Sequence, residues 1–283
     1  MNGPADRAQL ALLLEVAGTP KPGNVDRDRD LPDLLFEHFL AGAIGARPGL
    51  ELAEAGDPIG TAFERAVEGM ATQRGGNTQF GALLLLIPLV RAAAEGMTRP
   101  QCESVVDETS VSDAASFYRA FDHVDVAVGD PPPDAPALDV RRGADAIPAV
   151  RERGLDLQSV LELGVPGDDV AREWVTGFER SFAAADRFAD RDGPIADRAG
   201  GVYLSLLAER PDTLVATRHG ESVAADVHER AATLADRNAF ERDRTAVADF
   251  ADDLVAAGIN PGTTADLTAA GLFIALERES ITV

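Results

Sequence analysis

Residues that could bind an anion or move a proton gather at four loop-to-helix junctions of the 283-residue chain. The first junction, TPKPGNVDR at 19–27, contains Lys21, the only lysine among 26 basic residues. Pro20 and Pro22 stiffen the backbone around Lys21, so aiming its ammonium group at a ligand costs little conformational entropy. Because an ammonium is a good partner for phosphate, we predict a phosphate contact; a rigid turn with a surface lysine is the alternative. The same junction supplies four further candidates, Gly23, Asn24, Asp26 and Arg27.

The second junction, RGGNTQFG at 74–81, precedes a strongly apolar segment. Asn77 or Thr78 is expected to cap the helix that follows. A helix N-terminus also presents free N–H groups and the positive end of a dipole, so the junction could hold an anion or another ligand. The local pattern alone does not separate a ligand site from an ordinary cap.

The third junction, RPDTLVATRHG at 210–220, places Asp212 and Thr213 after a proline and Arg218 near the end of the segment. These residues could bind a ligand, with the guanidinium suited to phosphate. The alternative is a solvated loop in which the aspartate makes an Asx-type cap.

The fourth junction, NPGTTADL at 260–267, contains a turn at Pro261 and Gly262 followed by Asp266. The spacing from Thr263 to Asp266 is that of a capping-box variant, which would explain the aspartate without any chemistry. A carboxylate at this position could equally act as a base or bind a metal ion.

The strongest catalytic signatures are absent from the sequence. There is no Walker-type loop, CxxC, HExxH or Gly-x-Ser-x-Gly pattern, and the four histidines lack metal-ligand spacing. The single cysteine, Cys102, excludes an intrachain disulfide, and we expect it to be structural.

The composition indicates an acidic surface adapted to high salt. The chain has 48 acidic and 26 basic residues, a formal net charge of −22, and arginine almost wherever a lysine could stand. Because salt screens self-repulsion, such a halophilic surface tolerates this charge. Most acidic side chains should therefore be solvated, and the negative field argues against nucleic acid as a partner.

Helical periodicity dominates the pattern of apolar residues, which make up 45 % of the chain. We expect an all-α fold, a single compact bundle of roughly ten helices forming one domain over residues 1–283. Helices are expected at 5–17, 31–45, 56–71, 78–96, 111–124, 168–190, 199–210, 221–237, 241–258 and 263–280. The helix at 78–96 should be central and buried, because its residues are apolar nearly all round.

The Pro-rich segment GDPPPDAP at 129–136 is either a domain boundary or a surface loop within one domain. No secretory signal opens the chain, and the apolar run GALLLLIPLV is too short to span a bilayer. We therefore expect a soluble cytoplasmic protein without a membrane partner, and a homodimer is possible.

Taken in order, the junction motifs TPKPGNVDR, GGNTQFGALLLLIPL, PDTLVATRHG and NPGTTADLTAAGLF resemble the triphosphoribosyl-dephospho-CoA synthases over roughly Thr19 to Phe273. The resemblance implies an all-helical fold and transfer of the 5′-triphosphoribosyl group of ATP to the 2′-hydroxyl of dephospho-CoA, with release of adenine. It also implies Mg²⁺ as companion of the triphosphate.

The resemblance implies roles for the candidate residues. Lys21 and Arg218 would contact phosphates, and the helix N-terminus after Asn77 and Thr78 would bind phosphate or ribose. The resemblance does not divide the roles of base and Mg²⁺ ligand among the three candidate carboxylates, Asp26, Asp212 and Asp266.

The sequence departs from the family pattern after the first junction. Bacterial members continue into a Gly-Ala-His-x-Asp-Met-like stretch, whereas this chain continues DRDLPDLLFEHF. A related ATP-using transferase acting on a different cofactor precursor is therefore one alternative function, and a non-catalytic helical binding protein is another.

Overall fold

The computed structural model describes residues 3–165 and 167–283, and the described chain is helical and compact without β-strands. The all-α prediction is confirmed, but roughly ten helices was too few. The described residues form sixteen α-helices and two 3₁₀ helices. They are α1 (Pro4–Ala17), α2 (Phe36–Ala55), α3 (Ile59–Met70), α4 (Phe80–Ala93), α5 (Arg99–Asp107), α6 (Val111–Ala120), η1 (Pro136–Leu138), η2 (Val140–Ala146), α7 (Ile147–Arg153), α8 (Leu157–Glu162), α9 (Asp169–Val175), α10 (Glu179–Ala189), α11 (Ile195–Leu207), α12 (Thr213–His219), α13 (Glu221–Asp236), α14 (Ala239–Arg242), α15 (Arg244–Ala256) and α16 (Gly262–Glu277).

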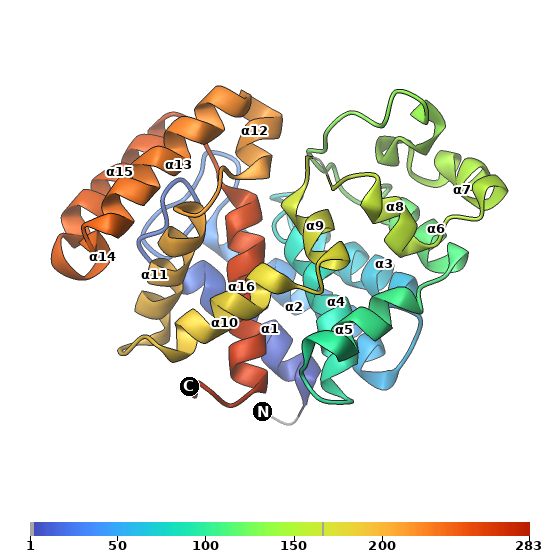
Figure 1. The fold of residues 1–283 in the computed structure, drawn as a ribbon, viewed down its shortest axis with the longest axis horizontal. Coiled ribbons are helices and arrows are strands. Elements are labelled where there is room, and N and C mark those ends of the chain that lie inside the picture. The colour runs from blue at the N-terminus through green and yellow to red at the C-terminus, as the bar shows by residue number, and fades with distance from the viewer. Residues whose placement is uncertain (1–2, 166) are drawn as a thin grey trace.

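Two buried helices, α4 and α16, organise the core. Eleven residues of α4 are buried, which confirms the expected central helix and follows from its apolar run. The C-terminal helix α16 packs against α1, α4, α10 and α11, and it runs through the middle of the view in Figure 1. Small side chains allow this close packing: a Cβ added at Gly271 of α16 would lie 2.5 Å from the Cβ of Ala184 in α10.

The starts of two helices differ from the sequence prediction. The second helix begins at Phe36 rather than Leu31, because Leu31 and Leu34 form a turn in which each backbone N–H donates to the other's carbonyl. The third begins at Ile59 rather than at Gly56. The Gly60 N–H in its first turn donates to Asp113 Oδ1 of α6, at 2.7 Å.

The single helix expected at 168–190 is wrong, since α9 and α10 are separated by a turn. Gly177 and Phe178 at that turn have φ values of 64° and 57°, in the left-handed region. The Glu173 carboxylate of α9 accepts the N–H groups of Arg180 and Ser181, at 3.0 and 2.8 Å. The first turn of α10 is therefore capped by a residue of the preceding helix.

The Pro-rich segment lies between α6 and η1, and the main group of buried apolar residues draws from both sides of it, including Leu85 and Phe273. This is consistent with one domain over 1–283, which stays a prediction. Within the described chain, no helix is both long and apolar enough to cross a bilayer.

Candidate active site

All four junctions meet at one cavity with a volume of about 550 Å³. Seven of the residues singled out in the sequence border it: Asn24, Asn77, Thr78, Thr213, Arg218, Gly262 and Asp266. Five others do not: Lys21, Gly23, Asp26, Arg27 and Asp212. Part of the candidate list thus borders the cavity, and the rest lies behind its wall.

The cavity has two kinds of lining. Its polar lining comes from the junctions, together with Glu15 of α1 and Asp168 at the start of α9. Its apolar lining comes from α4, α6, α8 and the Pro-rich segment. There the rings of Phe80 and Phe121 are 4.9 Å apart and meet edge to face. Such a cavity suits a ligand with both charged and apolar parts.

Asp266 is the candidate carboxylate that reaches the cavity. It does not cap its own helix, so the capping-box alternative is wrong; α16 begins at Gly262, and its N-cap residue, Pro261, makes no side-chain cap. Its carboxylate instead lies against α4, where a Cβ added at Gly81 would come within 2.1 Å of Asp266 Oδ2. Burial, helped by the charge of Glu15, raises the pKa of Asp266 well above its usual value.

Lys21 lies behind the cavity wall, fully buried. Its Nζ is 2.5 Å from Glu15 Oε1 and 3.0 Å from Asn24 Oδ1, and it lies 5.8 Å from the centre of the Tyr203 ring. Glu15 and Asn24 border the cavity. The pKa of Glu15 is raised by burial, which outweighs the lowering effect of Lys21. A direct phosphate contact would require this ammonium to leave Glu15.

Asp26 is buried and holds the first junction together. Its carboxylate accepts the Thr19 hydroxyl and the Lys21 backbone N–H, both at 3.0 Å, and the Asp28 N–H at 2.8 Å. The guanidinium of Arg29 is 3.3 Å away. Few lone pairs of Asp26 are left for a ligand.

The two other candidates of this junction also point away from the cavity. Gly23 has a φ of 74°, and a Cβ there would lie 2.3 Å from the Ile259 carbonyl oxygen, so glycine permits contact with the fourth junction. Arg27 is half-exposed beside Asp28.

Asp212 caps two helices at once. Its Oδ1 accepts the N–H groups of Leu214 and Val215 at the start of α12, at 2.9 and 3.1 Å, which confirms the Asx-type cap. Its Oδ2 accepts the N–H and hydroxyl of Thr264 in α16, at 2.8 and 2.7 Å. This carboxylate therefore fixes α12, which carries Arg218, against α16, which carries Asp266.

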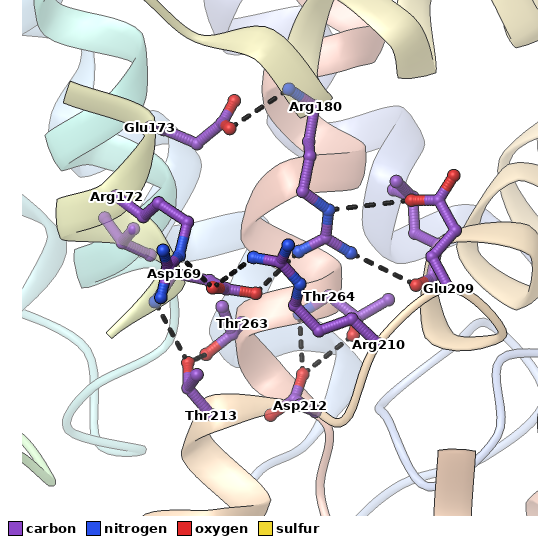
Figure 2. A network of polar contacts seen from close by, with 12 residues as sticks. Asp169, Arg172, Glu173, Arg180, Glu209, Arg210, Asp212, Thr213, Thr263 and Thr264 are labelled. Atoms are coloured by element: carbon purple, nitrogen blue, oxygen red, sulfur yellow. Dashed lines mark hydrogen bonds and ion pairs between the residues drawn. The ribbon is translucent and has the colours of Figure 1, made fainter. Parts of the chain in front are cut away.

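A buried ionic network supports the same wall, as Figure 2 shows. The Asp169 carboxylate contacts Arg172, Arg180 and Arg210 at 3.1, 2.7 and 3.0 Å. Its backbone N–H donates to the Thr213 hydroxyl, which is 3.1 Å from the hydroxyl of Thr263. Charge-assisted bonds thus join α9, α10 and the junctions before α12 and α16.

The second junction both caps a helix and borders the cavity. Asn77 Oδ1 accepts the Phe80 N–H at 3.1 Å, so the expected cap is present. The Thr78 hydroxyl and both amide atoms of Gln79 are buried without a hydrogen-bond partner.

Sequence reasoning missed Glu15, Gln79 and Asp168. Asp168 caps α9 through Val170, borders the cavity, and has a pKa raised by burial. An aspartate at the first position of the predicted helix 168–190 was the available signal for it; Glu15 sits on an apolar helix and gave none.

The three predicted metal ligands, Asp26, Asp212 and Asp266, do not form a ligand set. Over residues 3–165 and 167–283, no three His, Cys, Asp or Glu side chains gather closely enough to hold a metal ion. Among the same residues, Arg218 is the only basic side chain at the cavity, against five acidic residues: Glu15, Asp130, Asp139, Asp168 and Asp266.

The fold and the cavity define a helical protein with a pocket that has both a polar and an apolar lining. A model of the ATP:dephospho-CoA triphosphoribosyl transferase family matches residues 1–282, and the chain belongs to that family.

Individual relatives agree. A Pseudomonas fluorescens protein assigned as 2-(5''-triphosphoribosyl)-3'-dephosphocoenzyme-A synthase is 30 % identical over 98 % of this chain and 92 % of its own. A Pectobacterium atrosepticum synthase of the same name is 28 % identical over 93 % of this chain and 85 % of its own. A crystal structure assigned as triphosphoribosyl-dephospho-CoA synthase, from Archaeoglobus fulgidus, matches 84 % of this chain and 97 % of that chain. Its TM-score is 0.68 at 26 % identity.

Proposed function

We propose that this protein transfers the 5′-triphosphoribosyl group of ATP to the 2′-hydroxyl of 3′-dephospho-CoA and releases adenine. The observation that carries the proposal is the meeting of all four family motifs at one cavity, with Asp266 reaching into it. In the reaction, the 2′-hydroxyl oxygen bonds to C1′ of the ATP ribose as the C1′–N9 bond breaks. The hydroxyl proton passes to a base, and the electron pair of the broken bond leaves with adenine, which takes up a proton.

Asp266 is our choice for the base. It borders the cavity, it is free of the capping role expected for it, and its raised pKa makes it a stronger proton acceptor than an ordinary aspartate. Its negative charge would also favour positive charge developing on the ribose ring. Asp26 and Asp212, with their hydrogen bonds inside the protein, are better suited to positioning than to chemistry.

The triphosphate needs positive charge, and the cavity itself provides little. Arg218 and the N–H groups at the start of α4, after Asn77 and Thr78, supply some of it. Mg²⁺ bound mainly by phosphate oxygens, with Asp168 as a protein ligand, fits a site without a three-carboxylate cage. When bound, Mg²⁺ would neutralise charge on the triphosphate. We assign Lys21 an indirect role, orienting Glu15 and Asn24.

The apolar lining supports dephospho-CoA as the acceptor. Phe117, Phe121 and the Pro-rich segment offer a surface for the pantetheine arm. Thr213 and Gly262 border the polar lining, where they would contact ATP or the acceptor ribose.

Mass spectrometry of products from ATP, dephospho-CoA and Mg²⁺ tests the proposal. We expect free adenine and a single adduct that carries the triphosphoribosyl group. Adenine without an adduct would indicate a different acceptor, and the absence of adenine release would contradict transferase activity. Gln73→Leu is a matched control, because Gln73 lies outside the cavity and its side chain bonds only to Met70 at the end of α3 and to Gly75 and Gly76 of its own loop.

We also propose that the protein works in a salt-rich cytoplasm. The net charge of −22 supports this, because salt shortens the range of self-repulsion. Nucleic acid is not an expected partner, and a homodimer is an expectation that light scattering would check.

A further inference from the structure

Gln79 has a buried polar side chain, and the proposed reaction assigns it no role. The residue is 3 % exposed, and both its Nε2 and Oε1 lack a hydrogen-bond partner. Its backbone is anchored, since its N–H donates to Met70 Sδ at 3.3 Å. A buried carboxamide is normally paired, so an unpaired carboxamide on a residue that borders the cavity indicates a missing partner.

The neighbouring Thr78 and Gly42 strengthen this inference. The Thr78 hydroxyl is also buried and unpartnered, and it borders the same cavity. A Cβ added at Gly42 of α2 would lie 2.6 Å from Thr78 Oγ1 and 3.3 Å from Gln79 Oε1. Glycine at that position therefore leaves room for the two polar groups.

The chemistry of these groups selects a neutral planar ligand. A carboxamide presents one acceptor and one donor side by side, and the threonine hydroxyl can do either. Adenine presents the matching pair, a 6-amino donor beside a ring-nitrogen acceptor, which is the pairing that Gln makes with adenine in nucleic acids. A phosphate offers acceptors only and would leave Gln79 Oε1 unpaired.

The position of Gln79 favours adenine, the group that leaves ATP, as its ligand. Gln79 immediately precedes α4, and Gly81 in the first turn of α4 contacts the carboxylate of Asp266. Adenine is attached to C1′ of the ribose, which is the reacting atom. A pocket for adenine must therefore lie next to Asp266, the proposed proton acceptor. We propose that the carboxamide of Gln79, assisted by the Thr78 hydroxyl, binds the adenine ring of ATP and selects it among purines. The assignment to ATP rests on the proposed function.

The test removes one hydrogen-bonding group from the protein and one from the substrate. Wild-type enzyme and Gln79→Leu are assayed with ATP and with purine riboside 5′-triphosphate, which lacks the 6-amino group. Wild type should prefer ATP by about tenfold or more in kcat/KM, and Q79L should use both substrates about equally. The control Gln73→Leu changes a glutamine of the same loop that does not border the cavity, and it should keep the wild-type preference.

A binding measurement separates this inference from the proposed function. Calorimetry of adenine and purine with wild type and Q79L needs no turnover. It should show a preference for adenine in wild type that Q79L loses. If no adduct forms in the product assay but wild type still prefers adenine, the transferase proposal fails and the adenine site at Gln79 stands. If adduct forms and Q79L keeps the preference for ATP, the adenine site at Gln79 is wrong.

Two further arms complete the design. A dephospho-CoA analogue with purine in place of adenine tests the other adenine present; a Q79L effect confined to that analogue would overturn the assignment to ATP. Thermal unfolding checks that Q79L is folded. Gln79→Met, which keeps an unbranched chain, replaces it if it is not. Thr78→Val should weaken adenine binding in the same direction.

Discussion

The ammonium of Lys21 lies 2.5 Å from the carboxylate of Glu15, and both groups are buried beside Tyr203. Removing one partner of a buried ion pair leaves an uncompensated charge, so Lys21→Met should lower the free energy of unfolding by about 3–5 kcal/mol. The double variant Glu15→Leu with Lys21→Met should recover most of that loss. Urea unfolding at fixed salt measures both. If Lys21→Met is as stable as wild type, the ion pair does not stabilise the cavity wall.

The double cap made by Asp212 predicts a stability defect without a defect in chemistry. Asp212→Ala removes the caps of α12 and α16 together and should cost about 2–4 kcal/mol, from 1–2 kcal/mol for each cap. Asp212→Asn keeps an oxygen acceptor and should cost less. The measurements are denaturant unfolding and the rate of adenine release. A large fall in kcat for folded D212N would instead place Asp212 in the chemistry.

Asp266, unlike Asp212, should affect the rate of the reaction. Asp266→Asn removes the proposed base and should lower kcat by about 10²–10⁴-fold. The carboxylate must be ionised to accept a proton, so wild-type kcat should fall as the pH drops through a pKa well above the usual aspartate value. Adenine release measured across pH gives both quantities. A profile flat down to pH 4 would exclude Asp266 as the base.

The same pKa shift has a consequence for stability. Because the pKa of Asp266 is raised in the folded protein, the folded state binds the proton more tightly than the unfolded state. Its contribution to stability is therefore lost as pH rises above the ordinary aspartate pKa. Asp266→Asn should melt higher than wild type at neutral pH, and this gain should shrink toward acid pH. Calorimetric scans at several pH values test the sign.

Gly81 tests whether the position of the Asp266 carboxylate matters. Alanine is a better helix former than glycine by about 1 kcal/mol, so Gly81→Ala would stabilise α4 if there were space. The new Cβ would lie 2.1 Å from Asp266 Oδ2 and must displace it, so kcat should fall while thermal stability changes little. Ser104→Ala is the control, because Ser104 is an exposed residue of α5 that does not border the cavity. Equal activity of both variants would contradict the prediction.

Sequence periodicity predicted the helical class and most long helices, because one buried face is enough to leave a pattern. It failed at the break between α9 and α10, where Glu173 of one helix caps the next. The start of α16 was predicted to within one residue, at 263 against Gly262, but the side chain that caps it is Asp212, which lies 52 residues away from Thr264. The capping-box spacing of Asp266, an alternative that the sequence left open, is not used.

The candidate site divides in the same way. The sequence marked the four junctions as places of polar residues, and residues from all four, Asn77 and Asp266 among them, border the cavity. The rarity of lysine marked Lys21 as unusual but could not say whether its ammonium faces a ligand or a buried carboxylate. Gln79 gave no signal, because an unpaired amide becomes visible only when its neighbours in space are known.

The cavity also takes residues from both ends of the chain, Glu15 in α1 and Asp266 in α16. During synthesis, a growing chain therefore lacks the proposed base until α16 has been added. A ribosome-bound or truncated chain that lacks α16 would display the first three junctions without being able to complete the proposed reaction.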